Sequence, residues 1–350
     1  MSSRDVSSWR RLVVAGLFAT LTIAGSTWDL AEARAAVRHE ARGPVRSEAR
    51  APARQAKQAR TARKRVIHGA NYHPPYAAIV VDHNSGQVLH DEHADEPRRP
   101  ASLTKIMTLY LLFEQLEAGR LRLDTPLPVS SFAAQQNPTK LGLRADQTLP
   151  VEDAIKGLVT KSANDAAVVV SEALAGSEAA FAQLMTQKAR ALGMTNTVYI
   201  NASGLPAEEQ LTTARDQALL GRAIQDRFPE YYRYFSTLSF RYRGKEMRNH
   251  NALLGQVAGV DGIKTGFTEA SGYNLTVSVR RDDKHLVAVV LGGTSNAKRD
   301  ARMRELIERY IPAAATLKTA PKVVETGGQN ASFLGIPGFT GEPVRAGAPR

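Results

Sequence analysis

The chain has no cysteine among its 350 residues. This absence excludes a disulfide framework and a thiolate zinc site, although it is compatible with any redox compartment. The sequence also lacks the Gly-x-Ser-x-Gly elbow of a Ser-His-Asp hydrolase. The stretch from Gly262 to Gly266 is not a P-loop, because no glycine immediately precedes Lys264 and a strand is expected to follow. The sequence therefore predicts no disulfide framework, thiolate zinc site, Ser-His-Asp triad or P-loop.

No apolar run reaches the roughly 20 residues that a membrane-spanning helix needs. The run Leu12–Ile23 is interrupted by glycine and threonine, follows three arginines, and precedes small residues at Ala31, Ala33 and Ala35. This order is typical of a cleaved export signal, so we predict a signal peptide over residues 1–33. An uncleaved N-terminal anchor stays open as an alternative. Either way, we expect the protein in the periplasm or at the outer face of the cytoplasmic membrane.

The positive charge of the chain is unevenly distributed. The formal net charge is +12, but residues 34–68 hold eleven Lys or Arg and two Glu, and residues 69–350 carry only +3. Arginines recur at every fourth position from Arg34 to Arg54, and on a helix they would lie side by side as like charges. Pro44 and Pro52 would also interrupt such a helix. We predict a disordered Ala/Arg-rich linker over residues 34–70. Peripheral contact with anionic lipids is an alternative role, and an exported tail has no nucleic-acid partner.

The apolar fraction of 43% is sufficient for a real core, which we place in residues 71–312. Strand patterns lie at both ends of this region and helical patterns lie between them, so we predict an α/β sandwich whose antiparallel sheet is built from both ends, with an inserted helical region. Residues 121–149 read as loop-rich, residues 197–200 as a short strand, and residues 313–350 as a flexible tail. The strands are expected at 77–81, 87–90, 239–243, 245–249, 262–267, 273–280 and 286–291, and the helices at 151–159, 166–174, 178–192 and 213–227, with one more from Ser102 to Gly119 and a last one ending at Tyr310.

Ser102 and Lys105 stand at the point where a short loop becomes a long apolar helix. Three residues apart, their side chains share one face of a helix. A serine hydroxyl becomes a nucleophile when a neighbouring base takes its proton, and a lysine can do so only when neutral. Burial or a second cation lowers a lysine pKa. The pair is a candidate nucleophile and base, although the same spacing is common on solvated helix faces.

Two further stretches can complete such a site. The hydroxyl of Ser162 and the amide of Asn164 can relay a proton and hold a substrate amide. Lys264, Thr265 and Gly266 offer a cation and a hydroxyl for a carboxylate, together with a position where backbone can approach closely.

An oxyanion hole needs two backbone N–H groups, most simply those of Ser102 and Phe267. The charge of Lys264 would help to keep Lys105 neutral. We expect no metal and no cofactor, because the histidines and acids between His90 and His93 read as an exposed loop.

The three motifs Ser-x-x-Lys, Ser-x-Asn and Lys-Thr-Gly, in this order and with their flanks, resemble those of serine D-alanyl-D-alanine carboxypeptidases, the low-molecular-mass penicillin-binding proteins. The flanks are Ala101–Thr108, Lys161–Ala167 and Val260–Thr268, and the likeness extends over about residues 76–310. It implies a β-lactamase/transpeptidase-like fold, peptidoglycan stem peptides as substrates, and β-lactam antibiotics as covalent inhibitors. The family's best-known members also carry a further all-β domain and a membrane helix, for which residues 313–350 are too few.

The resemblance also implies roles for single residues. Ser102 would form the acyl-enzyme and Lys105 would be the general base, while Ser162 and Asn164 would assist proton transfer and substrate placement. Lys264, Thr265 and Gly266 would line the docking strand. Arg299 would hold the substrate carboxylate, with Lys298 and Arg302 as alternatives.

Three other functions fit parts of this pattern. A murein DD-endopeptidase uses the same site and differs in the shape of its pocket. A class A β-lactamase needs an added carboxylate to activate water, and the corresponding residues 197–206 contain none. A non-catalytic wall-binding protein would not need the reactive side chains, all of which are present.

Overall fold

The computed structural model describes residues 72–326. The predicted signal peptide and Ala/Arg-rich linker lie outside the described residues, as does the tail from residue 327 onward. None of the helices within the described range is long and apolar enough to cross a bilayer.

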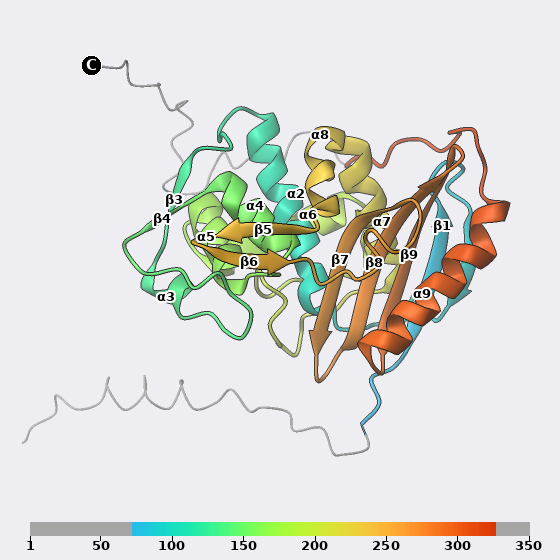
Figure 1. Ribbon diagram of the computed structural model, residues 1–350, viewed down its shortest axis with the longest axis horizontal. Coiled ribbons are helices and arrows are strands. Elements are labelled where there is room, and N and C mark those ends of the chain that lie inside the picture. Colours follow the sequence, from blue (N-terminus) through green and yellow to red (C-terminus); the bar gives the residue numbers. More distant parts are fainter. Residues whose placement is uncertain (1–71, 327–350) are drawn as a thin grey trace, which may run out of the picture. The chain divides into compact units, whose positions relative to one another are not determined.

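A five-stranded antiparallel sheet forms the body of the fold, in the order β2-β1-β9-β8-β7. The strand β1 pairs with β9, so that Ala77 lies opposite Leu291 and the two ends of the domain meet in one sheet (Figure 1). This confirms the predicted construction from both ends. The strands are β1 (Ala77–Asp82), β2 (Val88–Glu92), β7 (Val260–Thr268), β8 (Gly272–Arg281) and β9 (Lys284–Gly293).

Helices cover both faces of the sheet, which explains why β9 reads as one continuous apolar run. On one face lies α9 (Asn296–Tyr310), and on the other lie the remaining helices around α2 (Thr104–Glu117), which is buried along almost its whole length (Figure 1). Most of its buried residues are apolar, with Lys105, Glu114 and Gln115 buried among them. The other helices of this layer are α4 (Val151–Val159), α5 (Asn164–Ala175), α6 (Glu178–Ala191), α7 (Ala214–Arg227) and α8 (Pro229–Tyr232).

Two local predictions differ from the structure. The region expected to be loop contains α3 (Ser131–Ala134) and a small sheet of β3 (Pro126–Pro128) and β4 (Thr148–Pro150). Strands of three residues with proline at their ends give no alternating pattern to recognise. Residues 197–200, expected as a strand, form only one bridge, between Val198 and Leu211. The predicted hairpin is present as β5 (Ser239–Tyr242) and β6 (Lys245–Arg248).

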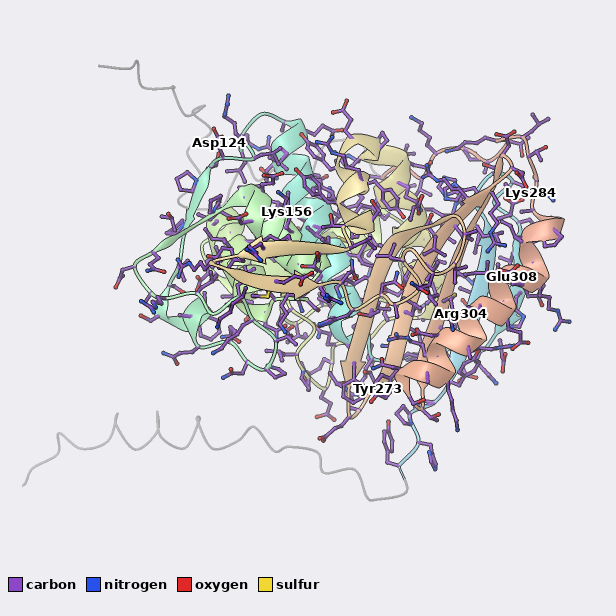
Figure 2. The ribbon with its side chains drawn as sticks, in the orientation of Figure 1. Asp124, Lys156, Tyr273, Lys284, Arg304 and Glu308 are labelled. Carbon is purple, nitrogen blue, oxygen red and sulfur yellow. The ribbon has the colours of Figure 1, made fainter. Side chains whose placement is uncertain are left out.

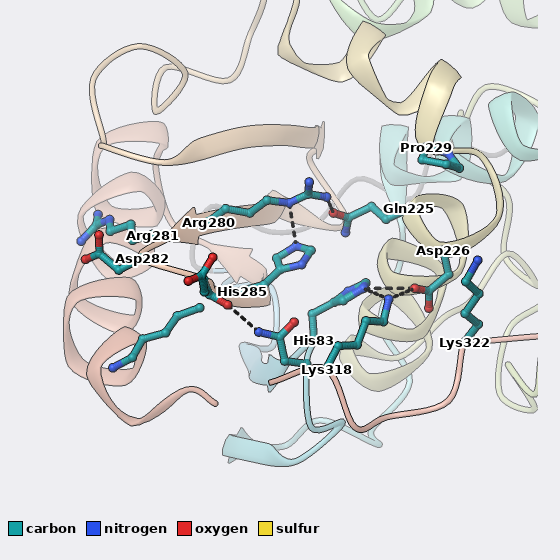
Figure 3. Close-up of a pocket in the computed structure, with 13 residues that line it drawn as sticks. His83, Gln225, Asp226, Pro229, Arg280, Arg281, Asp282, His285, Lys318 and Lys322 are labelled. Atoms are coloured by element: carbon teal, nitrogen blue, oxygen red, sulfur yellow. Dashed lines mark hydrogen bonds and ion pairs between the residues drawn. The ribbon is translucent and has the colours of Figure 1, made fainter. Parts of the chain in front are cut away.

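Residues 314–326 were expected in a flexible tail, and the structure corrects this. They form a strap, here called the C-terminal strap, that hydrogen-bonds to the body at several points. The N–H of Ala315 donates to Asp82, and that of Val323 donates to Asp226. Lys318 of the strap donates to Asp226 beside His83, at a pocket of about 500 Å³ (Figure 3). Such single bonds to distant residues leave no periodic signal in the sequence.

Candidate active site

Ser102 lies in a short 3₁₀ turn, η1 (Ala101–Leu103), at the start of α2. Two glycines let other backbone segments reach this turn. A side chain at Gly204, where φ is +83°, would overlap the carbonyl of Ala101. A Cβ atom at Gly266 of β7 would lie 3.0 Å from the amide nitrogen of Ser102. The amide of Asn274 also donates to the carbonyls that precede the turn, which fixes Ser102 beside the edge strand β7.

Lys105 is fully buried behind Ser102. Its Nζ atom lies 3.1 Å from Oγ of Ser102, 2.8 Å from Oδ1 of Asn164 and 2.5 Å from the carbonyl oxygen of Ser203. Burial, together with the charge of Lys264, holds the pKa of Lys105 well below its usual range. A neutral amine has two N–H donors for the two carbonyl-type oxygens and one lone pair for the proton of Ser102. The surroundings of Lys105 therefore match a general base.

Ser162 lies between α4 and α5, and Asn164 is the first residue of α5, where its Oδ1 accepts from Lys105. The Nδ2 group of Asn164 donates to Asn137, and the hydroxyl of Thr139 donates to the carbonyl of Ser162. Ser162 itself has φ at +58° and a buried hydroxyl without a hydrogen-bond partner in the described part of the chain. A buried unsatisfied hydroxyl is costly, so its retention suits a group that acts on a bound molecule.

Lys264 projects from β7 and is buried. Its ammonium donates to the carbonyl of Thr265 at 2.9 Å. Burial and the nearby charge of Arg299 lower the pKa of Lys264 to about 7. Arg299 is itself buried, pairs with Asp300 at 2.7 Å and donates to the carbonyl of Asn274. Lys264 thus acts on Lys105, and Arg299 in turn acts on Lys264.

The two alternatives to Arg299 lie elsewhere. Lys298 is exposed, and Arg302 pairs with Glu92 and Glu305. Phe267 is half-exposed, and its ring stacks on Tyr273 with centroids 4.2 Å apart. Within residues 72–326 no group of three His, Asp or Glu side chains is placed to hold a metal ion.

Several contributors were not predicted from the sequence. The carbonyl of Ser203 and the close approach of Gly204 come from the loop at residues 201–206, to which the sequence motifs gave no role in the site. Thr139 and Asn137 lie in the region expected to be plain loop. His250 is a further residue that the sequence did not point to. Burial, followed by the charges of Lys264 and other cations, lowers its pKa to about 4. No pattern in the sequence indicates that these loops meet at Ser102.

Comparison with known proteins gives a clear relationship. The profile of the D-alanyl-D-alanine carboxypeptidase family matches residues 66–295. The D-alanyl-D-alanine carboxypeptidase DacA of Escherichia coli K12 is 34% identical over 287 residues, covering 78% of this chain and 71% of that protein. This chain belongs to the D-alanyl-D-alanine carboxypeptidase family. The relationship confirms the predicted function, a serine-type D-Ala-D-Ala carboxypeptidase. The chain spans 71% of the length of DacA and 60% of the length of DacC, both from Escherichia coli K12.

Solved structures of the carboxypeptidase family and of related penicillin-binding proteins share the fold. The carboxypeptidase DacD of Francisella tularensis has a TM-score of 0.64 at 31% identity, covering 72% of this chain and 74% of its own. Penicillin-binding protein D2 of Listeria monocytogenes, in its cefotaxime-bound form, has a TM-score of 0.58 at 31% identity, covering 66% of this chain and 95% of its own. The predicted β-lactamase/transpeptidase-like α/β fold is thus confirmed.

Proposed function

We propose that this chain removes the terminal D-alanine from peptidoglycan stem peptides through an acyl-enzyme on Ser102. The observation that carries the proposal is the contact of Ser102 with a buried lysine whose pKa is strongly lowered. In the first step Oγ of Ser102 bonds to the carbonyl carbon of the penultimate D-alanine, and Nζ of Lys105 takes the hydroxyl proton.

The leaving amine then receives a proton as the C–N bond breaks. Ser162 would make this transfer, and the lack of another partner for its hydroxyl in the described residues supports that role. Asn164 would hold Lys105 in place. Water adds to the ester in the second step, with Lys105 again as the base, and releases the shortened peptide and free Ser102. The N–H groups of Ser102 and Phe267 would receive the oxyanion, since Gly266 brings β7 against the serine turn.

The substrate would lie along β7 as an added strand. β7 is an edge strand of the sheet, and extended peptides bind edges through main-chain hydrogen bonds. Its free carboxylate would meet the cations of Lys264 and Arg299, with the hydroxyl of Thr265 beside them.

β-Lactams would be covalent inhibitors of the same serine. Their strained amide presents one acyl carbon to Ser102, and opening the ring leaves an ester that blocks the site. The cefotaxime-bound form of the Listeria penicillin-binding protein, which shares this fold, supports the proposal.

The proposed location of the catalytic body is the periplasm or the outer face of the cytoplasmic membrane. The apolar run and Ala-x-Ala positions near the N-terminus support it, as does the position of peptidoglycan outside that membrane. Contact of the Arg-rich linker with anionic lipid is a further part of this proposal.

The direct test is release of free D-alanine from a pentapeptide that ends in D-Ala-D-Ala. The full chain should release it, whereas Ser102→Ala and Lys105→Met should lose activity by about 10³-fold or more, as removal of a nucleophile or its base does. A cross-linked dimer of stem peptides tests the endopeptidase alternative. Cleavage of the dimer without release from the pentapeptide would overturn the carboxypeptidase assignment.

A further inference from the structure

The loop at residues 201–206, which reaches the buried base, is shaped by the side chain of Asn201. Its Oδ1 atom accepts from three successive backbone N–H groups, the closest being that of Gly204 at 2.7 Å. Its Nδ2 group donates to a carbonyl of the same loop at 2.9 Å. The turn that results presents the carbonyl of Ser203 to Nζ of Lys105. A contact that fixes this loop therefore also fixes a partner of Lys105.

Two helices hold the loop through a single residue, Ala202. The hydroxyl of Thr108, on α2 three residues after Lys105, donates to the carbonyl of Ala202 at 2.7 Å. The N–H of Ala202 donates to Oε1 of Glu178, the first residue of α6, at 3.1 Å. Since Ala202 directly precedes Ser203, a displacement at Glu178 is passed on to the carbonyl that contacts the base.

Glu178 also acts on Lys105 through its charge. Burial and then the charge of Lys264 lower the pKa of Lys105, while the carboxylates of Glu178 and Asp165 oppose this lowering. Asp165, on α5, accepts three backbone N–H bonds from a different loop. His250 also faces this group of charges, because Lys105 contributes to the lowering of its pKa. Glu178 is thus the carboxylate that both holds the loop and offsets the positive surroundings of Lys105.

We propose that Glu178 is a positioning residue of the acylation reaction, which holds the loop on Lys105 through Ala202 and brings a negative charge to the surroundings of the base. When Lys105 takes the hydroxyl proton of Ser102, its nitrogen becomes an ammonium ion in a fully buried position. The carboxylate of Glu178 lowers the cost of this charge, and the loop supplies a carbonyl that accepts one of the N–H groups. The inference rests on the proposed function and adds a residue that sets the strength of its base.

The test measures the second-order rate of acylation of the full chain by benzylpenicillin as a function of pH, followed by intact mass. Glu178→Gln keeps an oxygen for the N–H of Ala202 but removes the charge, so Lys105 becomes a weaker base. We expect the acid limb of the profile to move to lower pH by about one unit and the plateau rate to fall about threefold. The basic limb, where Lys264 loses its charge, should stay in place, because Glu178 is not among the charges that act on Lys264.

Two further variants separate the charge from the contact. Glu178→Ala removes both the charge and the oxygen that holds Ala202, so the acid limb should move as in Glu178→Gln and the plateau rate should fall about tenfold further. Glu308→Gln removes a carboxylate from the exposed side of α9, on the other face of the sheet (Figure 2), and should keep the wild-type profile. Urea unfolding shows whether each variant is folded, and Glu178→Gln alone decides the test if Glu178→Ala is not.

Three results would overturn the inference alone: an acid limb at the wild-type pH in Glu178→Gln, an equal displacement of both limbs in that variant, or equal plateau rates in folded Glu178→Gln and Glu178→Ala. A wild type that is not acylated at any pH would overturn the proposed function and the inference together.

Discussion

Two buried lysines lie in the candidate active site, and their surroundings suit different chemical roles. Lys105 contacts Ser102, Asn164 and Ser203, so its nitrogen is surrounded by oxygens and kept uncharged by burial and Lys264. Lys264 has a pKa of about 7 and remains partly charged near neutral pH, as a ligand for a carboxylate requires. The sequence motifs identified both residues and the need for a neutral base. They did not indicate the carbonyl of Ser203, because a backbone atom carries no residue-type signal.

The lowered pKa of Lys264 predicts how stability depends on pH. Its pKa is about 7 in the folded chain and 10.5 ordinarily, so the unfolded chain binds more protons between these values. Stability therefore rises as the pH increases from 7, and Lys105 contributes with the same sign. From pH 7 to pH 9 we expect Lys264→Met to gain roughly 2 kcal/mol less than the wild type in free energy of unfolding. Urea denaturation of both proteins at pH 7 and pH 9 measures this difference in the free energy of unfolding.

The matched control is Lys298→Met on the exposed side of α9, which should keep the wild-type rise. A Lys264→Met variant with the same pH dependence as the wild type would show that Lys264 is not held at a lowered pKa.

At the level of elements, the candidate site brings together three segments that lie far apart in the chain, around Ser102, Ser162 and Lys264. The long elements were predictable, because α2, α7 and β9 have strong apolar periods or runs. The short elements and loops around them could not be predicted. Their positions depend on close contacts such as that of Gly204 with the serine turn, and such contacts have no local signature.

The contact at Gly204 can be separated from its backbone conformation. Gly204 and Gly176 both have positive φ, but only Gly204 faces the carbonyl of Ala101, while a side chain at Gly176 meets open space. We expect Gly176→Ala to cost about 1 kcal/mol and to leave acylation by benzylpenicillin unchanged. Gly204→Ala should cost more and slow acylation of Ser102 about tenfold or more, since it displaces the nucleophile. Equal acylation rates in both variants would show that the loop does not position Ser102.

At the level of the whole described region, the C-terminal strap connects the sheet to the helical layer. Glu325 pairs with Lys188 on α6 and with Arg227 on α7, close to Tyr110 on α2. Although burial opposes its ionisation, these cations lower the pKa of Glu325. The sequence could not predict that this segment packs on the body, because its composition is that of a linker. A few ion pairs with buried side chains hold it in place.

The buried ion pairs of the strap predict a loss of stability without a loss of activity. Glu325→Gln leaves Lys188 with only one carboxylate in a buried position. We expect this variant to unfold at lower urea, with a loss of about 1 to 3 kcal/mol, and to keep the wild-type acylation rate. Glu230→Gln, an exposed glutamate on α8, is the control and should change neither. Unchanged stability in Glu325→Gln would mean that the strap is not anchored by Glu325.

The central claim is that Ser102 is the acylated nucleophile of a D-Ala-D-Ala carboxypeptidase. Intact mass measured after incubation of the full chain with benzylpenicillin tests it most directly, with Ser102→Ala as the control. The account predicts one stable adduct per chain, absent from Ser102→Ala. An adduct that persists in Ser102→Ala, no adduct with the antibiotic intact, or rapid destruction of the antibiotic without an adduct would each contradict it.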